Sequence, residues 1–225
     1  TGDRRQATGD RRQATGDRRM IGFMTFPSRF GLIGDVHAAA DNLGVAIRHL
    51  RAEGVDQLLC VGDLVDGEGD LERCIELLMD ADVATVRGNH DRWLLADHMR
   101  QLPGAHLRDN LSEWVVEYIE RLPVTHSIVT TTGELLLSHG VGEDDMFFLR
   151  PDIGEYDIRM SDEIAEIVQS GVRWAVGGHT HQPMDLTIQS VRFINPGPIV
   201  DAPVGSCALL DVHAETVQTW PLASL

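Results

Sequence analysis

The sequence has little cysteine and an excess of negative charge. Among its 225 residues, the cysteines are only three, Cys60, Cys74 and Cys207, far apart and in apolar surroundings. We therefore expect buried reduced thiols rather than metal ligands or nucleophiles. Lysine and arginine number 19 against 35 aspartates and glutamates, which gives a formal net charge of −16. Because this charge repels phosphate backbones, nucleic-acid binding is not expected, and an anionic substrate would need bound cations nearby.

Long hydrophobic runs are also missing. No apolar stretch approaches the roughly 20 residues that cross a bilayer, and the polar start of the chain has no hydrophobic segment of a secretory signal. These absences predict a cytoplasmic protein with no membrane partner. A chain of this length that is 43% hydrophobic and 24% charged can bury a substantial core, which favours one domain over two.

The first residues repeat a polar heptad. Thr-Gly-Asp-Arg-Arg-Gln-Ala occupies residues 1–7 and again residues 8–14, and no apolar residue larger than alanine precedes Met20. Residues 1–19 therefore have nothing to bury and are expected to be disordered. Since aspartate accompanies the arginine pairs, we interpret the repeat as an extension of a chain that naturally begins near Met20, not as a nucleic-acid arm. Residues 20–225 are predicted to form the single domain.

From Phe30 onward, short apolar runs alternate with helical periods. Residues 30–33, 57–61 and 83–86 are predicted to be buried strands. The helix after the first strand places four apolar side chains on one face, Leu43, Ala46, Ile47 and Leu50. Asp70 can cap the helix that follows the second strand. This alternation predicts βαβ crossovers and a parallel sheet covered by helices.

The pattern changes in the second half of the chain. A helix over residues 111–122 is predicted to bury one face, formed by Trp114, Val115, Tyr118, Ile119 and Leu122. Thr132-Gly133 is a hairpin signal between two strands. A helix over 161–171, a strand over 172–176 and short strands over 186–220 follow. The predicted fold class is therefore α/β, a mixed β-sandwich of two sheets flanked by helices.

Five blocks of polar residues follow predicted strands, where open α/β sheets hold their ligands. In chain order they are Gly34-Asp35-Val36-His37, Gly62-Asp63-Leu64-Val65-Asp66, Gly88-Asn89-His90-Asp91, Ser138-His139-Gly140 and Gly178-His179-Thr180-His181. Carboxylate, amide oxygen and imidazole are the ligands that hard and borderline divalent metals prefer. Any one of these aspartates could instead cap a helix or form a turn. Five such blocks in succession favour a metal centre.

The spacing within the blocks favours two metal ions. Asp35 and His37 are two residues apart, so both side chains can point to the same side of an extended segment, and His179 and His181 repeat that spacing. Asp63 lies between the two pairs in the sequence. Because a carboxylate can bind two cations through its two oxygens, Asp63 is the candidate bridging ligand.

The ordered blocks resemble the signature of the calcineurin-like metallophosphoesterases, D-x-H, GD-x-x-D, GNH-D/E, a lone His and GH-x-H, from Gly31 to Pro198. The resemblance implies that family's fold and hydrolysis of a phosphate ester by a hydroxide that bridges two divalent metals. It implies one metal held by Asp35, His37, Asp63 and His181. It implies a second held by Asp63, Asn89, His139 and His179. Manganese is the first choice, with Fe, Zn, Ni, Co and Mg as alternatives.

Within that superfamily, the Gly-Asp-Leu-Val-Asp-Gly and Arg-Gly-Asn-His-Asp runs are similar to small bacterial and archaeal phosphodiesterases of the diadenosine-tetraphosphatase-related type. Protein phosphatases and symmetrical dinucleoside tetraphosphatases carry Gly after the first His and Arg-Gly after the second Asp of GD-x-x-D. This chain has Ala38 and Gly67 instead. The substrate-clamping arginine of that motif is absent, so protein phosphatase activity is not expected.

Two residues are assigned catalytic roles. By the same resemblance, His90 binds no metal and lies beside the substrate, where it would protonate the leaving oxygen. Asp91 would orient His90 and raise its basicity, or would merely start the helix that contains Trp93 and Leu94. Asp66 either orients another site residue or is only a turn acid. The remaining histidines match no block and are interpreted as surface or locally satisfied residues: His49, His98, His106, His126 and His213.

The sequence leaves the substrate and the oligomeric state open. We expect a small phosphorylated partner in a pocket built by residues 93–111 and 142–160. The alternative is a dinucleoside polyphosphate hydrolase in which a purine is held by Trp93, Phe147 and Phe148, although core packing explains these aromatic residues equally well. A third interpretation is a non-catalytic scaffold of the same fold. Scaffolds in this superfamily have typically lost ligands or the catalytic histidine, and this chain retains both.

Overall fold

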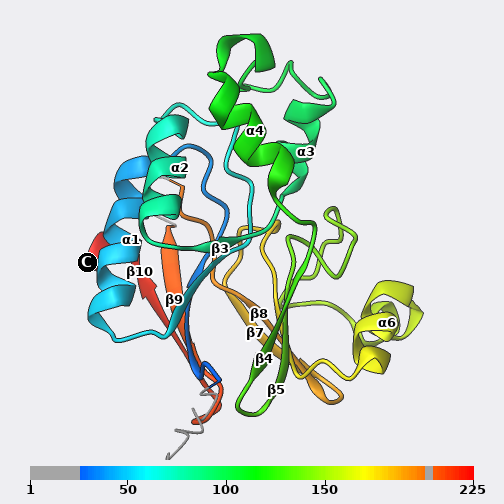
Figure 1. The fold of residues 1–225 in the computed structure, drawn as a ribbon. Coiled ribbons are helices and arrows are strands. Elements are labelled where there is room, and N and C mark those ends of the chain that lie inside the picture. Colours follow the sequence, from blue (N-terminus) through cyan, green and yellow to red (C-terminus); the bar gives the residue numbers. More distant parts are fainter. Residues whose placement is uncertain (1–25, 201–204) are drawn as a thin grey trace, which may run out of the picture.

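Two five-stranded sheets pack face to face between layers of helices (Figure 1). The computed structural model describes residues 26–200 and 205–225. The predicted α/β sandwich of two mixed sheets is confirmed. The expectation of disorder for residues 1–19 falls outside the described residues. In the described part of the chain, no helix is long and apolar enough to cross a membrane.

The first sheet has the strand order β10-β9-β1-β2-β3. Its strands are β1 (Arg29–Ile33), β2 (Gln57–Cys60), β3 (Ala84–Thr85), β9 (Ser206–Asp211) and β10 (Thr216–Pro221). β1, β2 and β3 run parallel, whereas β9 pairs antiparallel with β1 and β10. The crossover helices are α1 (Ala40–Ala52) and α2 (Leu71–Asp80). Asp70 caps α2 as predicted, because its carboxylate accepts a hydrogen bond from the backbone N–H of Arg73.

The second sheet has the order β4-β5-β6-β8-β7. Its strands are β4 (His126–Thr130), β5 (Gly133–Leu137), β6 (Trp174–Val176), β7 (Met184–Ile188) and β8 (Val191–Asn195). β4 and β5 form the predicted antiparallel hairpin, while β6 runs parallel to both β5 and β8. Helix α6 (Asp162–Ser170) is capped by Ser161 and ends at Gly171, whose φ of 86° closes the helix with a left-handed residue.

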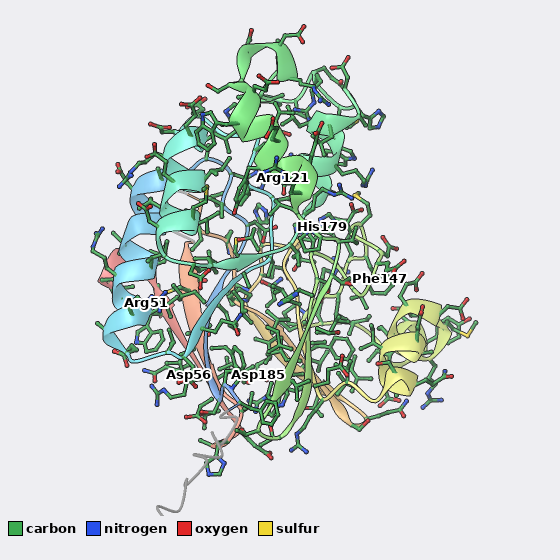
Figure 2. All side chains as sticks on the ribbon, viewed as in Figure 1. Arg51, Asp56, Arg121, Phe147, His179 and Asp185 are labelled. Atoms are coloured by element: carbon green, nitrogen blue, oxygen red, sulfur yellow. The ribbon has the colours of Figure 1, made fainter. Side chains whose placement is uncertain are left out.

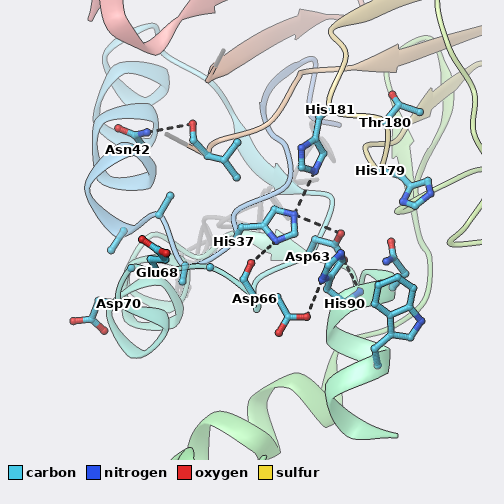
Figure 3. Close-up of a pocket in the computed structure, with 18 of the residues that line it drawn as sticks. His37, Asn42, Asp63, Asp66, Glu68, Asp70, His90, His179, Thr180 and His181 are labelled. Atoms are coloured by element: carbon cyan, nitrogen blue, oxygen red, sulfur yellow. Dashed lines mark hydrogen bonds and ion pairs between the residues drawn. The ribbon is translucent and has the colours of Figure 1, made fainter. Parts of the chain in front are cut away.

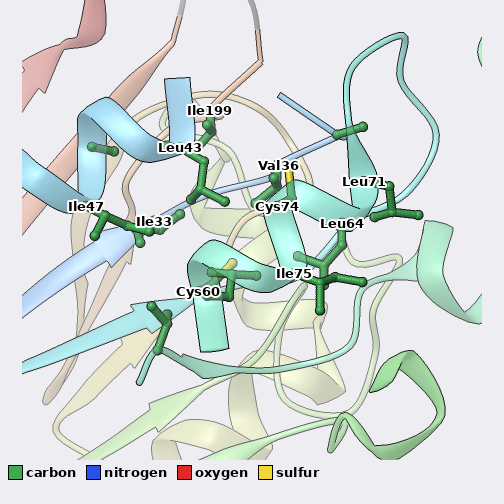
Figure 4. Close-up of a cluster of buried hydrophobic side chains, with 14 of the residues drawn as sticks. Ile33, Val36, Leu43, Ile47, Cys60, Leu64, Leu71, Cys74, Ile75 and Ile199 are labelled. Atoms are coloured by element: carbon green, nitrogen blue, oxygen red, sulfur yellow. The ribbon is translucent and has the colours of Figure 1, made fainter. Parts of the chain in front are cut away.

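Side chains that alternate along the strands separate the apolar core into layers. Phe30 and Leu32 of β1 point into the space between the sheets, which side chains fill (Figure 2), while Ile33 points toward α1 and α2. The helix-side layer contains the buried thiols of Cys60 and Cys74 (Figure 4). A third layer lies between the second sheet and α6. The loops at the ends of β1 and β2 are therefore anchored from both faces of their sheet.

Helix α4 (Glu113–Arg121) lies where a helix is predicted, but the expectation that Trp114 is on its buried face is wrong. Val115, Val116 and Ile119 are buried, whereas 40% of the Trp114 surface is exposed. Since each residue turns about 100° around the axis, Trp114 lies outside the buried stripe. The remaining helical segments are α3 (Asn89–Leu95), α5 (Glu155–Met160), η1 (Arg108–Asn110) and η2 (Leu222–Ser224).

Candidate metal centre

The five polar blocks meet at one edge of the sandwich. Three of them follow β1, β2 and β3 of the first sheet, and two follow β5 and β6 of the second. Three groups of ligand atoms each lie within 4.8 Å of one another: Asp35 with His37 and His181, Asp35 with Asp63 and His139, and His37 with Asp63 and His90. Of these residues, His37, Asp63, His90 and His181 line a cleft of about 1000 Å³ (Figure 3). The folded chain thus gathers the predicted ligand types in one place.

Around His37, ring nitrogens and carboxylate oxygens lie within 3.3 to 3.8 Å of one another. Nε2 of His37 lies 3.3 Å from Nε2 of His181 and 3.8 Å from Oδ2 of Asp63, and Nε2 of His181 lies 3.6 Å from Oδ1 of Asp35. Nδ1 of His37 is 2.9 Å from the carbonyl oxygen of Val65. Nδ1 therefore carries the hydrogen, which leaves a lone pair on Nε2. A cation among these atoms would satisfy all of them.

The same arrangement recurs around His139. Its Nδ1 lies 2.9 Å from the carbonyl oxygen of Val61, and its Nε2 lies 2.9 Å from Oδ1 of Asn89 and 3.2 Å from Oδ2 of Asp63. Burial by itself lowers the pKa of His139, but the negative charge of Asp63 and Asp35 outweighs it and raises this pKa to about 10. The surroundings of His139 therefore favour positive charge strongly.

Buried atoms without partners support the same interpretation. Oδ2 of Asp35 and Nε2 of His179 are buried and have no hydrogen-bond partner. Such atoms are rare in folded proteins, because each one costs the full free energy of its desolvation. Together with the ring nitrogens and carboxylate oxygens that converge at His37 and His139, they fit a centre that binds divalent cations.

Backbone strain is concentrated at this centre. Five of its residues adopt left-handed φ angles between 43° and 65°: His37, Asp63, Asp66, His179 and His181. Each such residue costs on the order of 1–3 kcal/mol and persists only where the surrounding structure holds it. The backbone N–H of His37 donates to the carbonyl oxygen of Asp63 at 2.8 Å, and Gly88 packs so closely on Asp63 that a Cβ there would collide with the carboxylate.

The prediction that Asp91 orients His90 is wrong. The fully buried carboxylate of Asp91 accepts hydrogen bonds from the backbone N–H groups of Leu64 at 2.9 Å, Val65 at 3.3 Å and Gly88 at 2.9 Å. Asp91 lies in the first turn of α3, where a carboxylate folds back onto the helix start instead of reaching its neighbour's ring. Burial raises the pKa of Asp91 to about 6. Asp91 therefore holds two loops together.

Asp66 is the carboxylate that contacts His90. Nδ1 of His90 lies 2.8 Å from Oδ2 of Asp66, and the guanidinium of Arg100 donates to both Asp66 oxygens at 2.8 and 2.9 Å. Burial would raise the pKa of Asp66, but the hydrogen bonds from His90 and Arg100 outweigh burial and lower this pKa to about 2. Conversely, burial would lower the pKa of His90, and the Asp66 contact raises it.

The sequence interpretation missed two residues of this network. The guanidinium of Arg100 forms an ion pair with Asp66. His106, which the sequence analysis interpreted as a surface or locally satisfied histidine, accepts a hydrogen bond from the backbone N–H of Asp66 at 2.9 Å. Both lie between α3 and η1, in a segment without helical or strand periodicity. The only signal was the expectation that residues 93–111 form a pocket wall.

Aromatic side chains border the cleft on the side of the second sheet. The ring of Trp93 lies 4.7 Å from that of His90, and the ring of Phe148 lies 4.5 Å from that of His179. Phe147 points into a separate small apolar cavity next to Ile167 and does not line the cleft. Trp93 and Phe148 are thus placed to contact a substrate, whereas Phe147 is not.

The chain was compared with known proteins. Residues 29–215 match the calcineurin-like phosphoesterase superfamily domain. An uncharacterized protein of Methanocaldococcus jannaschii is 29% identical over 68 residues, which are 30% of this chain and 28% of that protein. The matched stretch therefore spans less than a third of that relative.

Solved structures share the fold at low sequence identity. A hypothetical protein of Pyrococcus horikoshii OT3 superposes with a TM-score of 0.70 at 17% identity, covering 86% of this chain and 87% of that one. A metallophosphoesterase from Sphaerobacter thermophilus gives 0.62 at 20% identity, with 87% and 88% covered. An archaeal phosphodiesterase gives 0.54 at 18%, with 86% and 99% covered.

These matches confirm the predicted family and fold. The family match covers all five polar blocks and every strand of the two sheets except β10. The domain is the one on which metal-dependent phosphoric ester hydrolases of this type are built, and its metal-ligand groups are present. The chain belongs to the calcineurin-like phosphoesterase superfamily.

Proposed function

We propose that this protein hydrolyses a small phosphate ester at a dinuclear metal centre. The observation that carries the proposal is the convergence of imidazole nitrogens of His37, His139 and His181 on the buried carboxylate of Asp63 and on one another. Bound divalent cations, Mn²⁺ first among them, would supply an activated water and neutralise charge on the phosphoryl group. A scaffold protein would have no use for this costly arrangement.

We assign the ligands to two sites that share Asp63. Asp35, His37, Asp63 and His181 would hold one ion, and Asp63, Asn89, His139 and His179 the other. Oδ2 of Asp63 lies 3.2 Å from Nε2 of His139 and 3.8 Å from Nε2 of His37, and Oδ1 accepts from the backbone N–H of His90 at 2.8 Å, which fixes the carboxylate in place. This position between the two histidines supports Asp63 as the bridge.

His90 would be the general acid. Asp66 engages its Nδ1, so Nε2 is the nitrogen that can deliver a proton to the leaving oxygen in the cleft (Figure 3). A leaving alkoxide needs this proton, while p-nitrophenolate is stable without it. The contact with Asp66 keeps the ring oriented and favours its protonated form.

The test measures metal content and hydrolysis together. Protein loaded with Mn²⁺ is assayed on a methyl nitrophenyl diester, bis(p-nitrophenyl) phosphate and a dialkyl phosphate diester, and metals are counted by mass spectrometry. For His90→Asn we expect full metal content and about 10²- to 10⁴-fold slower hydrolysis of the dialkyl diester, with a much smaller loss on nitrophenyl esters.

The matched control is His213→Asn, because His213 is an exposed histidine in the turn between β9 and β10, beside the start of β1 and thus at the end of the first sheet opposite the blocks. This control should match the unchanged protein on every substrate. Equal losses on alkyl and nitrophenyl esters, or loss of a metal from His90→Asn, would contradict the general-acid role. Absence of hydrolysis from protein that holds both metals would contradict the proposed function itself.

A further inference from the structure

Among the described residues, the charged side chains that line the cleft above the metal centre are acids and histidines. Asp41, Glu68 and Asp70 border it on one side, in addition to Asp63 and Asp66 at its floor. Of the residues described in the structure, no lysine or arginine lines the cleft. The positive charge of Arg100 is neutralised by its ion pair with the Asp66 carboxylate. A substrate phosphate would therefore meet positive charge only from the bound metals and from His90.

The acidic side of the cleft is held rigidly in place. Glu68 lies between Gly67 and Gly69, and a Cβ at either glycine would collide with a backbone carbonyl oxygen, that of His37 or that of Ala38. The loop is therefore pressed against the chain that carries the candidate ligand His37. Figure 3 shows Glu68 and Asp70 on the opposite side of His37 from His179.

The three outer carboxylates are solvent-exposed, and within residues 26–200 and 205–225 they have no basic partner. The exposed side chains are Asp41 at the start of α1, Glu68 in the glycine loop and Asp70, whose Oδ1 accepts only the backbone N–H of Arg73. We call these three residues the acidic rim. Their cleft also contains an independent sign of a ligand, because Nε2 of His179, which lines the cleft, is buried and has no hydrogen-bond partner among the described residues.

We propose that the acidic rim makes this site select phosphodiesters with a single negative charge over dianionic monoesters and polyphosphates. The proposal rests on the proposed function, because it concerns the substrate class of that same site. A diester has one negative charge, which the metals can neutralise. Each further charge on a monoester or a polyphosphate chain must extend toward the rim and be repelled. The dinucleoside polyphosphate alternative is therefore disfavoured, although Trp93 and Phe148 could contact a base.

The expected size of the effect follows from Coulomb's law with screening. At physiological salt, one charge about 8–10 Å from another changes an equilibrium by about 1.3-fold in bulk water and by about 2- to 4-fold at the effective dielectric constant of about 20 near a protein surface. Three rim charges at an exposed cleft fall between these limits, so they should change selectivity for one additional substrate charge by about 3- to 10-fold, and by more for a polyphosphate. This preference should weaken as salt is added, because the rim is exposed to solvent.

The test is a triple variant, Asp41→Asn with Glu68→Gln and Asp70→Asn, in which Asn at position 70 still caps α2. With Mn²⁺ bound, kcat/KM is compared on bis(p-nitrophenyl) phosphate, p-nitrophenyl phosphate and diadenosine tetraphosphate. We expect the variant to gain about 3- to 10-fold on the monoester and more on the tetraphosphate, with less than about 2-fold change on the diester.

A binding measurement gives a readout that does not depend on turnover. Isothermal titration of the Mn²⁺-loaded protein with sulfate, a dianion, and with dimethyl phosphate, a monoanion, should show tighter sulfate binding in the triple variant, by about 3- to 10-fold. Dimethyl phosphate should bind both proteins within about 2-fold of one another.

The matched control removes the same number of charges elsewhere, through Asp80→Asn with Asp109→Asn and Glu113→Gln, all exposed and outside the cleft. The control should leave the selectivity unchanged. An equal gain on all substrates and anions, or the same gain from the control, would overturn the proposal. If the unchanged protein hydrolyses none of the esters with both metals bound, the proposed function fails, and the sulfate titration still decides the role of the rim.

Discussion

The two sheets contribute to the metal centre in different ways. The loops after β1, β2 and β3 of the first sheet supply every carboxylate and the amide, and they are bonded to one another. Examples are the backbone contact of His37 with Asp63 and the contacts of the Asp91 carboxylate with Leu64 and Val65. The second sheet supplies only imidazoles, and those reach across to the first. Nδ1 of His139 contacts the carbonyl oxygen of Val61.

This difference indicates that the first sheet fixes the carboxylates of the metal centre and that the second sheet adds imidazoles to it. The first-sheet loops keep their geometry through contacts within their own sheet, so they form a framework of negative charge. The imidazoles of the second sheet reach their positions only when the sandwich closes. Within that second group, His139 is fully buried while 39% of the His181 side chain is exposed. Substitutions on the two sides should therefore have different consequences.

The largest loss should come from Asp63→Ala, which removes the shared carboxylate of the framework. We expect both metals to be lost and hydrolysis to fall by more than the roughly 10- to 100-fold typical of residues that only orient a ligand. Asp35→Ala should mainly empty one site. Metal counting by mass spectrometry checks this, and two metals retained by Asp63→Ala would show that Asp63 is not the bridge.

The second sheet's histidines should separate by burial. His139→Ala should lose one metal and lower the free energy of unfolding of the metal-free protein by about 1–3 kcal/mol, because Asn89 and Asp63 lose a buried partner. His181→Ala should weaken one metal site while changing the unfolding free energy by less than about 0.5 kcal/mol. Urea unfolding in chelator provides the comparison. Equal destabilisation by both substitutions would show that burial does not distinguish them.

Asp66→Asn should affect the reaction without removing metals. The neutral amide no longer favours the protonated ring of His90, so we expect hydrolysis of a dialkyl diester to slow by about 10- to 100-fold. Both metals should remain bound, and nitrophenyl esters should be affected less. A loss of metal from this variant, measured by mass spectrometry, would instead place Asp66 in the coordination of the ions.

Asp91→Asn should have the smallest effect on turnover and act on stability. One side of an amide cannot accept a hydrogen bond, so at least one of the N–H groups of Leu64, Val65 and Gly88 loses its partner. We expect a loss of about 1–3 kcal/mol in unfolding free energy. Asp70→Asn is the control, since asparagine caps helices as well as aspartate does. If Asp91→Asn keeps full stability but slows hydrolysis as much as Asp66→Asn, the assignment of the two carboxylates is reversed.

Much of the fold could be predicted because it depends on local patterns. Asp70 and Ser161 cap their helices, Gly171 ends α6, and Thr132-Gly133 connects β4 to β5, each through contacts a few residues apart. The error at Trp114 has the opposite origin. The helix was predicted correctly, but which flank of it meets α3 and the first sheet depends on packing that the periodicity of a single helix does not contain.

The same division applies to the centre itself. The sequence by itself determined which ligand types are present and that each follows a strand, because parallel strands bring their carboxyl ends to one edge. Only the tertiary structure decided which groups meet. His90 contacts Asp66, 24 residues away, rather than its neighbour Asp91, and Arg100 reaches Asp66 from a loop without periodicity. The partner of a side chain depends on the loop positions that result from the packing of the sheets and helices. Residues that are adjacent in sequence on a helix point in different directions, so His90 and Asp91 do not face each other.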